Sequence, residues 1–295
     1  MSRRHLLMLL ALSALWGASF MFIKVGVRDF SPATLVWLRL TVAAATLAPI
    51  ALLSAGRSAF AELRAEWRLL AVLGTANSAI PFWFLSWGET RIDSGLAAII
   101  QASAPIYTAV LAWRFSRSER VSGARLAGVL VGLAGVALLV GDQRGGAVLG
   151  ALAVLVTAFC YAASALWGGR RLAHVTPLTL ALGTMSTAAL LTLPFGLAQL
   201  PGELPGWKPV ASVLALGIGG SALAYLLYYA ILLGAGASRV ILVTYLVPAA
   251  ALAYGVALLG ESVQATALGG LALVLAGVAL GTGAVRLTRR GSLRA

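Results

Sequence analysis

Ten apolar stretches run along this chain with only short connections between them. A helix rises about 1.5 Å per residue and the hydrocarbon core of a bilayer is about 30 Å thick, so a helix of about 20 apolar residues crosses it. Hydrophobic residues make up 60% of the 295 positions and charged residues 11%, whereas soluble domains have about 45–50% and about 25%. The sequence therefore predicts an all-α integral membrane protein and excludes a soluble one.

We expect ten transmembrane helices, at residues 5–27, 33–54, 68–88, 92–113, 122–141, 147–167, 178–200, 209–234, 238–259 and 265–285. The first stretch is too long for a signal peptide and is interpreted as a retained helix. The connections leave no segment for a soluble catalytic domain. Cys160 is the only cysteine, which excludes disulfides and cysteine-ligated metals. We predict no metal site and no cofactor.

The net charge of +13 follows the topology rather than a nucleic-acid surface. If the N-terminus is cytoplasmic, sixteen of the 22 Lys and Arg residues lie on the cytoplasmic side, five lie on the other side, and Arg39 lies within the second span. This bias predicts a multi-pass protein of the cell inner membrane with both termini cytoplasmic and basic residues that contact anionic lipid headgroups. We expect no nucleic-acid partner, and a monomer is possible.

The two halves of the sequence resemble each other. The motif Ser-Ala-Leu-Trp-Gly occurs at 13–17 and 164–168, a Ser-Ala pair precedes a proline by 27 positions at 78–79 and 221–222, and Leu-Ala-Gly-Val-Ala-Leu occurs at 133–138 and 275–280. Five crossings per half is an odd number, so the second half, residues 144–295, is predicted to be inverted relative to the first, residues 1–143. Inverted repeats are typical of secondary transporters.

The chain resembles the ten-helix, EamA-like exporters of the drug/metabolite transporter superfamily over its full length. The resemblance rests on Leu15-Trp16-Gly17 with Phe22 and Lys24, on Arg39, on Pro105 with Glu119, and on the glycines from Gly128 to Gly135, with Trp167-Gly168, Pro248 and Glu261 in the second half. It implies export or exchange of metabolites, including amino acids, by alternating access through a cavity between the halves.

Ionisable groups within spans are functional candidates because they are unfavourable there. Lys24 is either an interfacial anchor or a carboxylate contact at the outer mouth, and Arg39 is either structural or a substrate contact. Glu89 and Glu261, at outer helix ends, are expected to cap or pair rather than titrate. No Asp, Glu or His lies near the middle of a predicted span, so the sequence does not predict proton antiport and leaves facilitated exchange open.

Neutral polar and aromatic residues at mid-depth are candidates for lining a cavity, where they could hold a zwitterion with an apolar side chain. Hydrogen bonding between helices is the alternative role. The predicted substrate-binding set is Trp16, Asn77, Ser78, Pro81, Gln101, Tyr107, Tyr161, Trp167, Tyr225 and Tyr245, and Ser164, Tyr228 and Tyr229 lie at similar depth.

Prolines and glycines within the spans have different predicted roles. Pro105 and Pro248 are repeat-equivalent and are predicted to kink helices beside the transport site. The GxxxG spacings at Gly128 and Gly132 and at Gly277 and Gly281 predict close helix packing.

The sequence thus favours a transporter that exports or exchanges small amphiphilic metabolites, with neutral or aromatic amino acids as the leading class. A multidrug or other-metabolite efflux carrier is the alternative within the same class of protein. An intramembrane enzyme is the rival of another class, but it needs a nucleophile with a base, or paired carboxylates, on facing helices. The spans contain no such arrangement, so we predict that the protein is not an enzyme.

Overall fold

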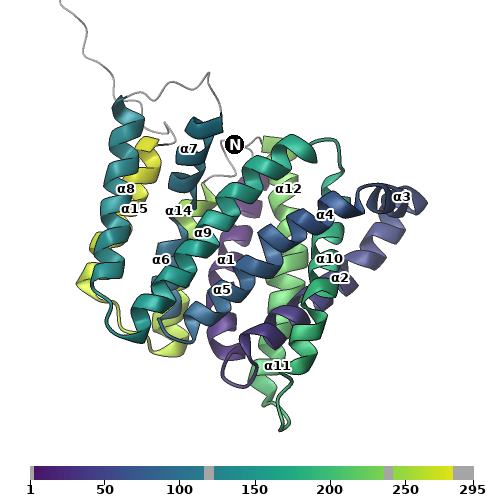
Figure 1. Cartoon of the computed structure of the whole chain (residues 1–295), viewed down its shortest axis with the longest axis horizontal. Coiled ribbons are helices and arrows are strands. Elements are labelled where there is room, and N and C mark those ends of the chain that lie inside the picture. Colours follow the sequence, from purple (N-terminus) through teal and green to yellow (C-terminus); the bar gives the residue numbers. More distant parts are fainter. Residues whose placement is uncertain (1–2, 116–122, 236–241, 282–295) are drawn as a thin grey trace, which may run out of the picture.

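The computed structural model describes residues 3–115, 123–235 and 242–281, and in these ranges the chain forms helices and no strand (Figure 1). The elements are α1 (Arg3–Gly26), α2 (Pro32–Ala55), α3 (Arg57–Ala65), α4 (Trp67–Gly74), η1 (Thr75–Ala79), α5 (Ile80–Glu89), α6 (Ser94–Gln101), α7 (Ala104–Phe115), α8 (Gly123–Gly141), α9 (Gly146–Arg171), α10 (Pro177–Ala198), α11 (Trp207–Leu214), η2 (Ala215–Leu223), α12 (Ala224–Ala235), α14 (Val243–Tyr254), η3 (Gly255–Leu259) and α15 (Ala265–Gly281), where η marks a π-helical segment. Glu119 lies outside the described residues, and so do seven of the sixteen basic residues expected on the cytoplasmic side: Arg117, Arg120, Arg239, Arg286, Arg289, Arg290 and Arg294.

Within the described residues, seven helical stretches are long and apolar enough to cross a membrane. They are Arg3–Gly26, Pro32–Ala55, Trp67–Glu89, Ser94–Ala112, Gly146–Arg171, Pro177–Ala198 and Trp207–Leu232. Three shorter apolar helices, Leu126–Gly141, Val243–Leu259 and Ala265–Leu280, lie where the sequence predicts the other three spans. The predicted all-α, multi-pass membrane fold is therefore confirmed.

One helix lies where the sequence predicts only a connection. The short helix α3 follows α2 after Gly56, whose positive φ of 57° ends the longer helix and turns the chain. Four of the nine residues of α3 are polar or charged, and Ala59 is buried against the bundle. Because α3 is amphipathic and short, its apolar content is too small to predict a span.

The start of α2 illustrates how local sequence sets helix ends. Pro32 occupies the first turn, where a missing backbone N–H carries no penalty. The Ser31 hydroxyl precedes it and accepts a hydrogen bond from the Thr34 N–H at 3.1 Å, which satisfies one of the free donors of the first turn. The chain therefore reverses between α1 and α2 within a few residues.

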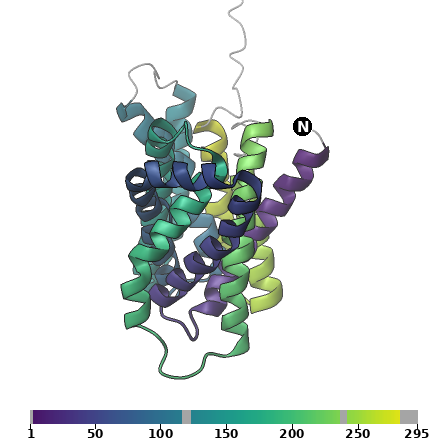
Figure 2. The same cartoon turned by 90° about the vertical axis from the view of Figure 1, so that its right-hand side faces the viewer.

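The helices are arranged around a central group of α1, α5, α9 and α12 (Figure 1). α8 and α15 pack against each other at one end of the long axis, and α2 packs against α10 at the other end. Figure 2 shows the N-terminal end of α1 and the connection between α10 and α11 at opposite ends of the helices. α1 contacts α14, and α5 contacts α9.

The α8–α15 pair confirms that the glycine spacings serve packing. A methyl group added to Gly277 would lie 2.5 Å from the Gly132 Cα and 2.7 Å from the Gly128 carbonyl oxygen. The two backbones therefore touch where only glycine fits, as expected for small residues at a membrane helix interface.

Candidate functional site

A cavity of about 970 Å³ lies between the helices. Residues of α1, α2, α5, α6 and α7 line it from the first half of the chain, and residues of α9, α10, α12 and α14 line it from the second. No residue of α8 or α15 within the described ranges borders it. We call this space the central cavity.

The central cavity is open at one end and closed at the other. Ala165, Gly169 and Ala173 line it and are exposed, so it reaches the surface where α9 ends and α10 begins. At the other end the lining residues Phe20, Ile23, Phe82 and Leu85 are buried. Figure 1 shows that α1 also begins at the open end.

The π-helical segment η1 brings Asn77 to the cavity wall. Pro81 follows η1 and has no N–H to donate to the carbonyl of Asn77, so regular α-helical bonding cannot continue through this turn. The Thr157 hydroxyl of α9 donates to the Pro81 carbonyl oxygen at 3.0 Å. The Asn77 side-chain amide donates to the Tyr225 hydroxyl at 3.1 Å, which links the two halves across the cavity.

Aromatic side chains form one wall of the central cavity. The ring centroids of Trp16 and Tyr228 are 5.7 Å apart, those of Trp16 and Tyr225 are 6.3 Å apart, and those of Tyr228 and Tyr229 are 5.2 Å apart. These separations are in the range of favourable ring contacts. The wall offers apolar faces together with hydroxyl groups.

Arg39 supplies positive charge to the cavity. It is 5% exposed, its Nε donates to the Ser221 hydroxyl at 2.8 Å, and its guanidinium carbon lies 3.9 Å from the centre of the Phe82 ring. The described residues accept no further hydrogen bond from this guanidinium. The terminal nitrogens Nη1 and Nη2 are thus available to a carboxylate in the cavity.

Several of the predicted site residues meet at the central cavity. They are Trp16, Asn77, Gln101, Tyr161 and Tyr225, together with Arg39 and the two predicted kink residues Pro105 and Pro248. The oxygen of the Gln101 amide and the hydroxyl of Ser164 are buried there without a hydrogen-bond partner among the described residues. These groups can bond to a polar ligand.

The remaining predicted residues lie elsewhere. Ser78 is fully buried within η1, and Pro81 is buried against α9. Tyr107 contacts Phe159 edge to face, Trp167 packs beside Leu70 and Leu172, and the Tyr245 hydroxyl is buried away from the cavity.

Sequence reasoning did not select Phe82, Ser19, Thr108 or Thr244 as site residues, although all four line the cavity. Phe82 directly follows Pro81 and is the only one with a readable signal, since the proline predicts an irregular turn there. The others are ordinary small residues in the predicted spans. Which face of a helix borders the cavity depends on the packing of distant segments.

The closed end holds a group of charged residues, and the structure gives each a different role. Lys24 Nζ donates to the backbone carbonyls of Glu89 at 2.8 Å and Ile92 at 2.7 Å, so it caps the C-terminus of α5. The Glu261 carboxylate accepts hydrogen bonds from the backbone N–H groups of Ser94 and Gly95 and from the Ser94 hydroxyl, so it caps the N-terminus of α6. The capping role expected for Glu261 is confirmed.

Glu89 does not follow the same expectation. It is fully buried, and neither carboxylate oxygen has a hydrogen-bond partner in the described part of the chain. The expectation that Glu89 caps or pairs is therefore wrong, because Lys24 bonds to the backbone oxygen of Glu89 and not to its side chain.

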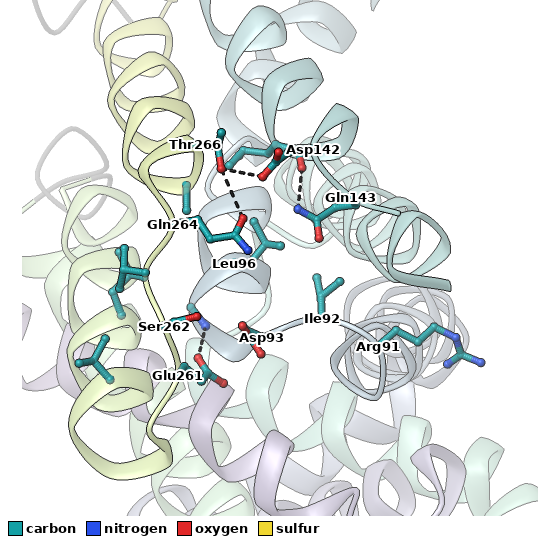
Figure 3. A pocket seen from close by; sticks show the side chains of 16 residues that line it. Arg91, Ile92, Asp93, Leu96, Asp142, Gln143, Glu261, Ser262, Gln264 and Thr266 are labelled. Atoms are coloured by element: carbon teal, nitrogen blue, oxygen red, sulfur yellow. Dashed lines mark hydrogen bonds between the residues drawn. The ribbon is translucent and has the colours of Figure 1, made fainter. Parts of the chain in front are cut away.

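A small pocket of about 140 Å³ lies next to this group of charges. Figure 3 shows Asp93, Gln264 and Thr266 around it, with Glu261 below. The Thr266 hydroxyl donates to Asp142 at 2.6 Å, which ties the start of α15 to the end of α8. Burial raises the pKa of Asp93, and the nearby Glu261 carboxylate adds to the rise.

Comparison with known proteins identifies relatives over most of the chain. The sequence pattern of the EamA-like transporter family matches residues 3–141 and 148–282. The chain is 32% identical to a probable terminal-alkyne amino-acid exporter of Streptantibioticus cattleyicolor, across 90% of this chain and 89% of that protein. It is 27% identical to a probable amino-acid metabolite efflux pump of Salmonella typhimurium, across 98% of each.

A solved crystal structure with 23% sequence identity aligns with 97% of this chain and 100% of that chain at a TM-score of 0.70, which shows a shared fold. The expected family resemblance is confirmed by the family match, which spans nearly the whole chain. The protein is a multi-pass membrane transporter that belongs to the EamA-like transporter family.

Proposed function

We propose that this protein exports or exchanges small amphiphilic metabolites, with neutral and aromatic amino acids as the leading class, by alternating access through the central cavity. The observation that carries the proposal is the cavity itself. It is formed by helices from both halves of the chain, is open at one end only, and is lined by aromatic and neutral polar groups with one arginine among its described lining residues. In this account the ten predicted spans form two inverted halves, 1–143 and 144–295.

Helix irregularities in the two halves support the inverted repeat. The matching Ser-Ala pairs lie in η1 and in η2, so a π-helical segment interrupts equivalent spans in both halves. Interrupted helices at corresponding positions are typical of transport sites. The family match also divides into two segments, 3–141 and 148–282, which correspond closely to the proposed halves.

Helix contacts agree with an approximate twofold relation between the halves. α2 packs on its counterpart α10, and α8 packs on its counterpart α15. η1 contacts α10 as η2 contacts α2, and α1 contacts α14 as α9 contacts α7. Exchange of the two half conformations would then turn a cavity open at one end into one open at the other.

The chemistry of the cavity supports an amino-acid ligand. The free nitrogens of Arg39 match a carboxylate, the unpartnered Gln101 oxygen accepts from an ammonium group, and the Trp16 and Tyr228 rings accommodate an apolar or aromatic side chain. A phosphate ligand would need more cations than the described lining provides. The two named relatives, an amino-acid exporter and an amino-acid metabolite efflux pump, support the same class.

The distribution of basic residues supports an inner-membrane protein with cytoplasmic termini. Arg3, Arg4, Arg170 and Arg171 lie at the open end of the cavity, at the starts or ends of their helices. Since basic residues are enriched on the cytoplasmic side, the open end faces the cytoplasm in this account. The structure then corresponds to the inward-open form of the carrier.

Neighbouring residues of α7 give a matched test of the cavity. Ala109 lines the central cavity, whereas Val110 is 40% exposed on the outer surface of the bundle. We expect Ala109→Trp to abolish counterflow of radiolabelled phenylalanine in proteoliposomes and Val110→Trp to retain it. Equal rates in the two folded variants would show that the substrate does not pass through this cavity.

A further inference from the structure

Glu89 is a buried acid whose burial the proposed transport cycle does not explain. Its side chain is 0% exposed, and both carboxylate oxygens lack a hydrogen-bond partner among the described residues. An ionised carboxylate loses its hydration on burial, and this loss is strongly unfavourable unless hydrogen bonds or an ion pair compensate. The enclosed site therefore favours the carboxyl group with a proton bound.

The charged groups that face Glu89 are committed to other contacts. Lys24 of α1 bonds through Nζ to two backbone carbonyls, and Arg39 of α2 bonds through Nε to Ser221. Glu261, which follows η3, is occupied by the N-terminus of α6 and carries a like charge. These three are the charged side chains that act on Glu89, and the described residues form no ion pair with it.

The position of Glu89 connects it to the central cavity. Phe82, Leu85 and Glu89 follow one another at spacings of three and four, so they lie along one face of α5. Phe82 and Leu85 line the closed end of the cavity. Glu89 lies one turn further, roughly 6 Å along the helix axis from Leu85, which places it between the cavity and the opposite surface.

We propose that Glu89 is a proton-binding site that couples substrate export to proton uptake. This inference rests on the proposed function, because it assumes a carrier whose closed end opens in the other half of the cycle. When that end opens, water reaches Glu89 and a proton binds to a carboxylate oxygen. Closure buries the acid and thus admits only its neutral form.

Release of the proton completes the exchange. The positive charges of Lys24 and Arg39 favour the ionised carboxylate once either side chain or water can reach it. The proton leaves into the central cavity, which Arg39 borders. One proton then enters the cell for each substrate molecule that leaves it, and no other reactant is needed.

Proteoliposomes separate coupling from transport. With an acidic interior and an alkaline exterior, we expect the wild-type protein to accumulate a labelled neutral amino acid against its concentration gradient. Glu89→Gln, which resembles the neutral acid in shape, should keep counterflow and lose this accumulation. Glu203→Gln, in an exposed connection, should behave as the wild type. Accumulation by Glu89→Gln at the wild-type level, or wild-type counterflow that ignores the gradient, would overturn the proposal.

An infrared measurement tests the site without any substrate. The purified wild-type protein at neutral pH should show the carbonyl stretch of a protonated carboxyl group, and Glu89→Gln should lack that band while Glu203→Gln retains it. Identical spectra for the wild type and Glu89→Gln would overturn the proton site. Loss of the band in Glu89→Gln together with absence of counterflow for every amino acid would uphold the proton site and refute the proposed substrate class instead.

Discussion

The contact between α8 and α15 predicts that two glycine-to-alanine changes on one helix differ in their effect on stability. In Gly277→Ala the new methyl group would lie 2.5 Å from the Gly132 Cα, whereas carbon atoms in contact are separated by about 3.5 Å or more. The helices must then move apart by roughly 1 Å, and such overpacking costs about 1–3 kcal/mol. The higher helix propensity of alanine offsets up to about 1 kcal/mol of this cost.

Gly269→Ala is the matched control on α15. Its nearest neighbour would be the Leu138 Cδ2 at 3.7 Å, an ordinary contact, so only the gain in helix propensity applies. We therefore expect Gly277→Ala to lower the melting temperature by several degrees and Gly269→Ala to leave it unchanged or raise it slightly, since about 1 kcal/mol shifts Tm by roughly 2–4 °C in proteins of 150–250 residues.

Thermal unfolding of the purified protein in one detergent, followed by intrinsic fluorescence, measures both shifts. Neither helix lines the central cavity in the described ranges, so folded Gly277→Ala should transport with an unchanged KM. A Gly277→Ala protein as stable as Gly269→Ala would show that the two backbones are not in contact, and the described α8–α15 packing would be wrong.

Three further changes test the site and one surface contact. Trp16→Ala removes a ring of the aromatic wall, which contacts Tyr228 and is proposed to hold the substrate side chain. A contact between aromatic rings is worth about 0.5–1.5 kcal/mol, so the KM for phenylalanine, measured by counterflow, should rise roughly twofold to tenfold. The KM for alanine should change little. Arg39→Lys keeps the charge but loses the planar guanidinium, whose terminal nitrogens are proposed to bind the substrate carboxylate and whose Nε bonds to Ser221. Loss of a charged hydrogen bond costs about 1.5–3 kcal/mol, so calorimetry should show roughly tenfold to 150-fold weaker binding of phenylalanine. Binding of phenethylamine, which has no carboxylate, should be unaltered. Burial acts to raise the pKa of Glu62, but the hydrogen bonds that its carboxylate accepts, including those from Thr176, outweigh burial and lower the pKa. The resulting stability is present above the unfolded pKa of about 4.3 and is lost as pH falls through the lower folded value. We therefore expect Glu62→Gln to destabilise the protein at pH 7 and to have no such effect at pH 3, as measured by unfolding at the two pH values. Equal changes of KM for phenylalanine and alanine would contradict the prediction for Trp16→Ala, and equal weakening of phenylalanine and phenethylamine binding would contradict the prediction for Arg39→Lys. The same destabilisation at both pH values would contradict the prediction for Glu62→Gln.

The hydropathy pattern made the all-helical membrane fold predictable. The apolar stretches give helices because a span must satisfy its own backbone hydrogen bonds in lipid, and seven of the predicted ranges contain helices of full spanning length. The glycine spacings predicted close helix packing, since only small residues let backbones touch, but they did not predict that α8 and α15 are partners.

The cavity was less predictable because depth along a span does not determine which way a side chain faces. Asn77 and its neighbour Ser78 have the same depth, yet the first lines the cavity and the second is buried in η1. Glu89 was misjudged for a related reason. It lies at a helix end, where sequence suggests exposure, but Lys24 and the segment around Glu261 close over that end.

The most direct test of the account is counterflow of radiolabelled amino acids by the wild-type protein in proteoliposomes, with aliphatic, aromatic and charged members measured in parallel. We expect exchange of neutral amino acids, strongest for aromatic ones, and none of charged ones. Absence of exchange for every amino acid by folded protein would contradict the proposed substrate class and direct the search to drugs and other metabolites.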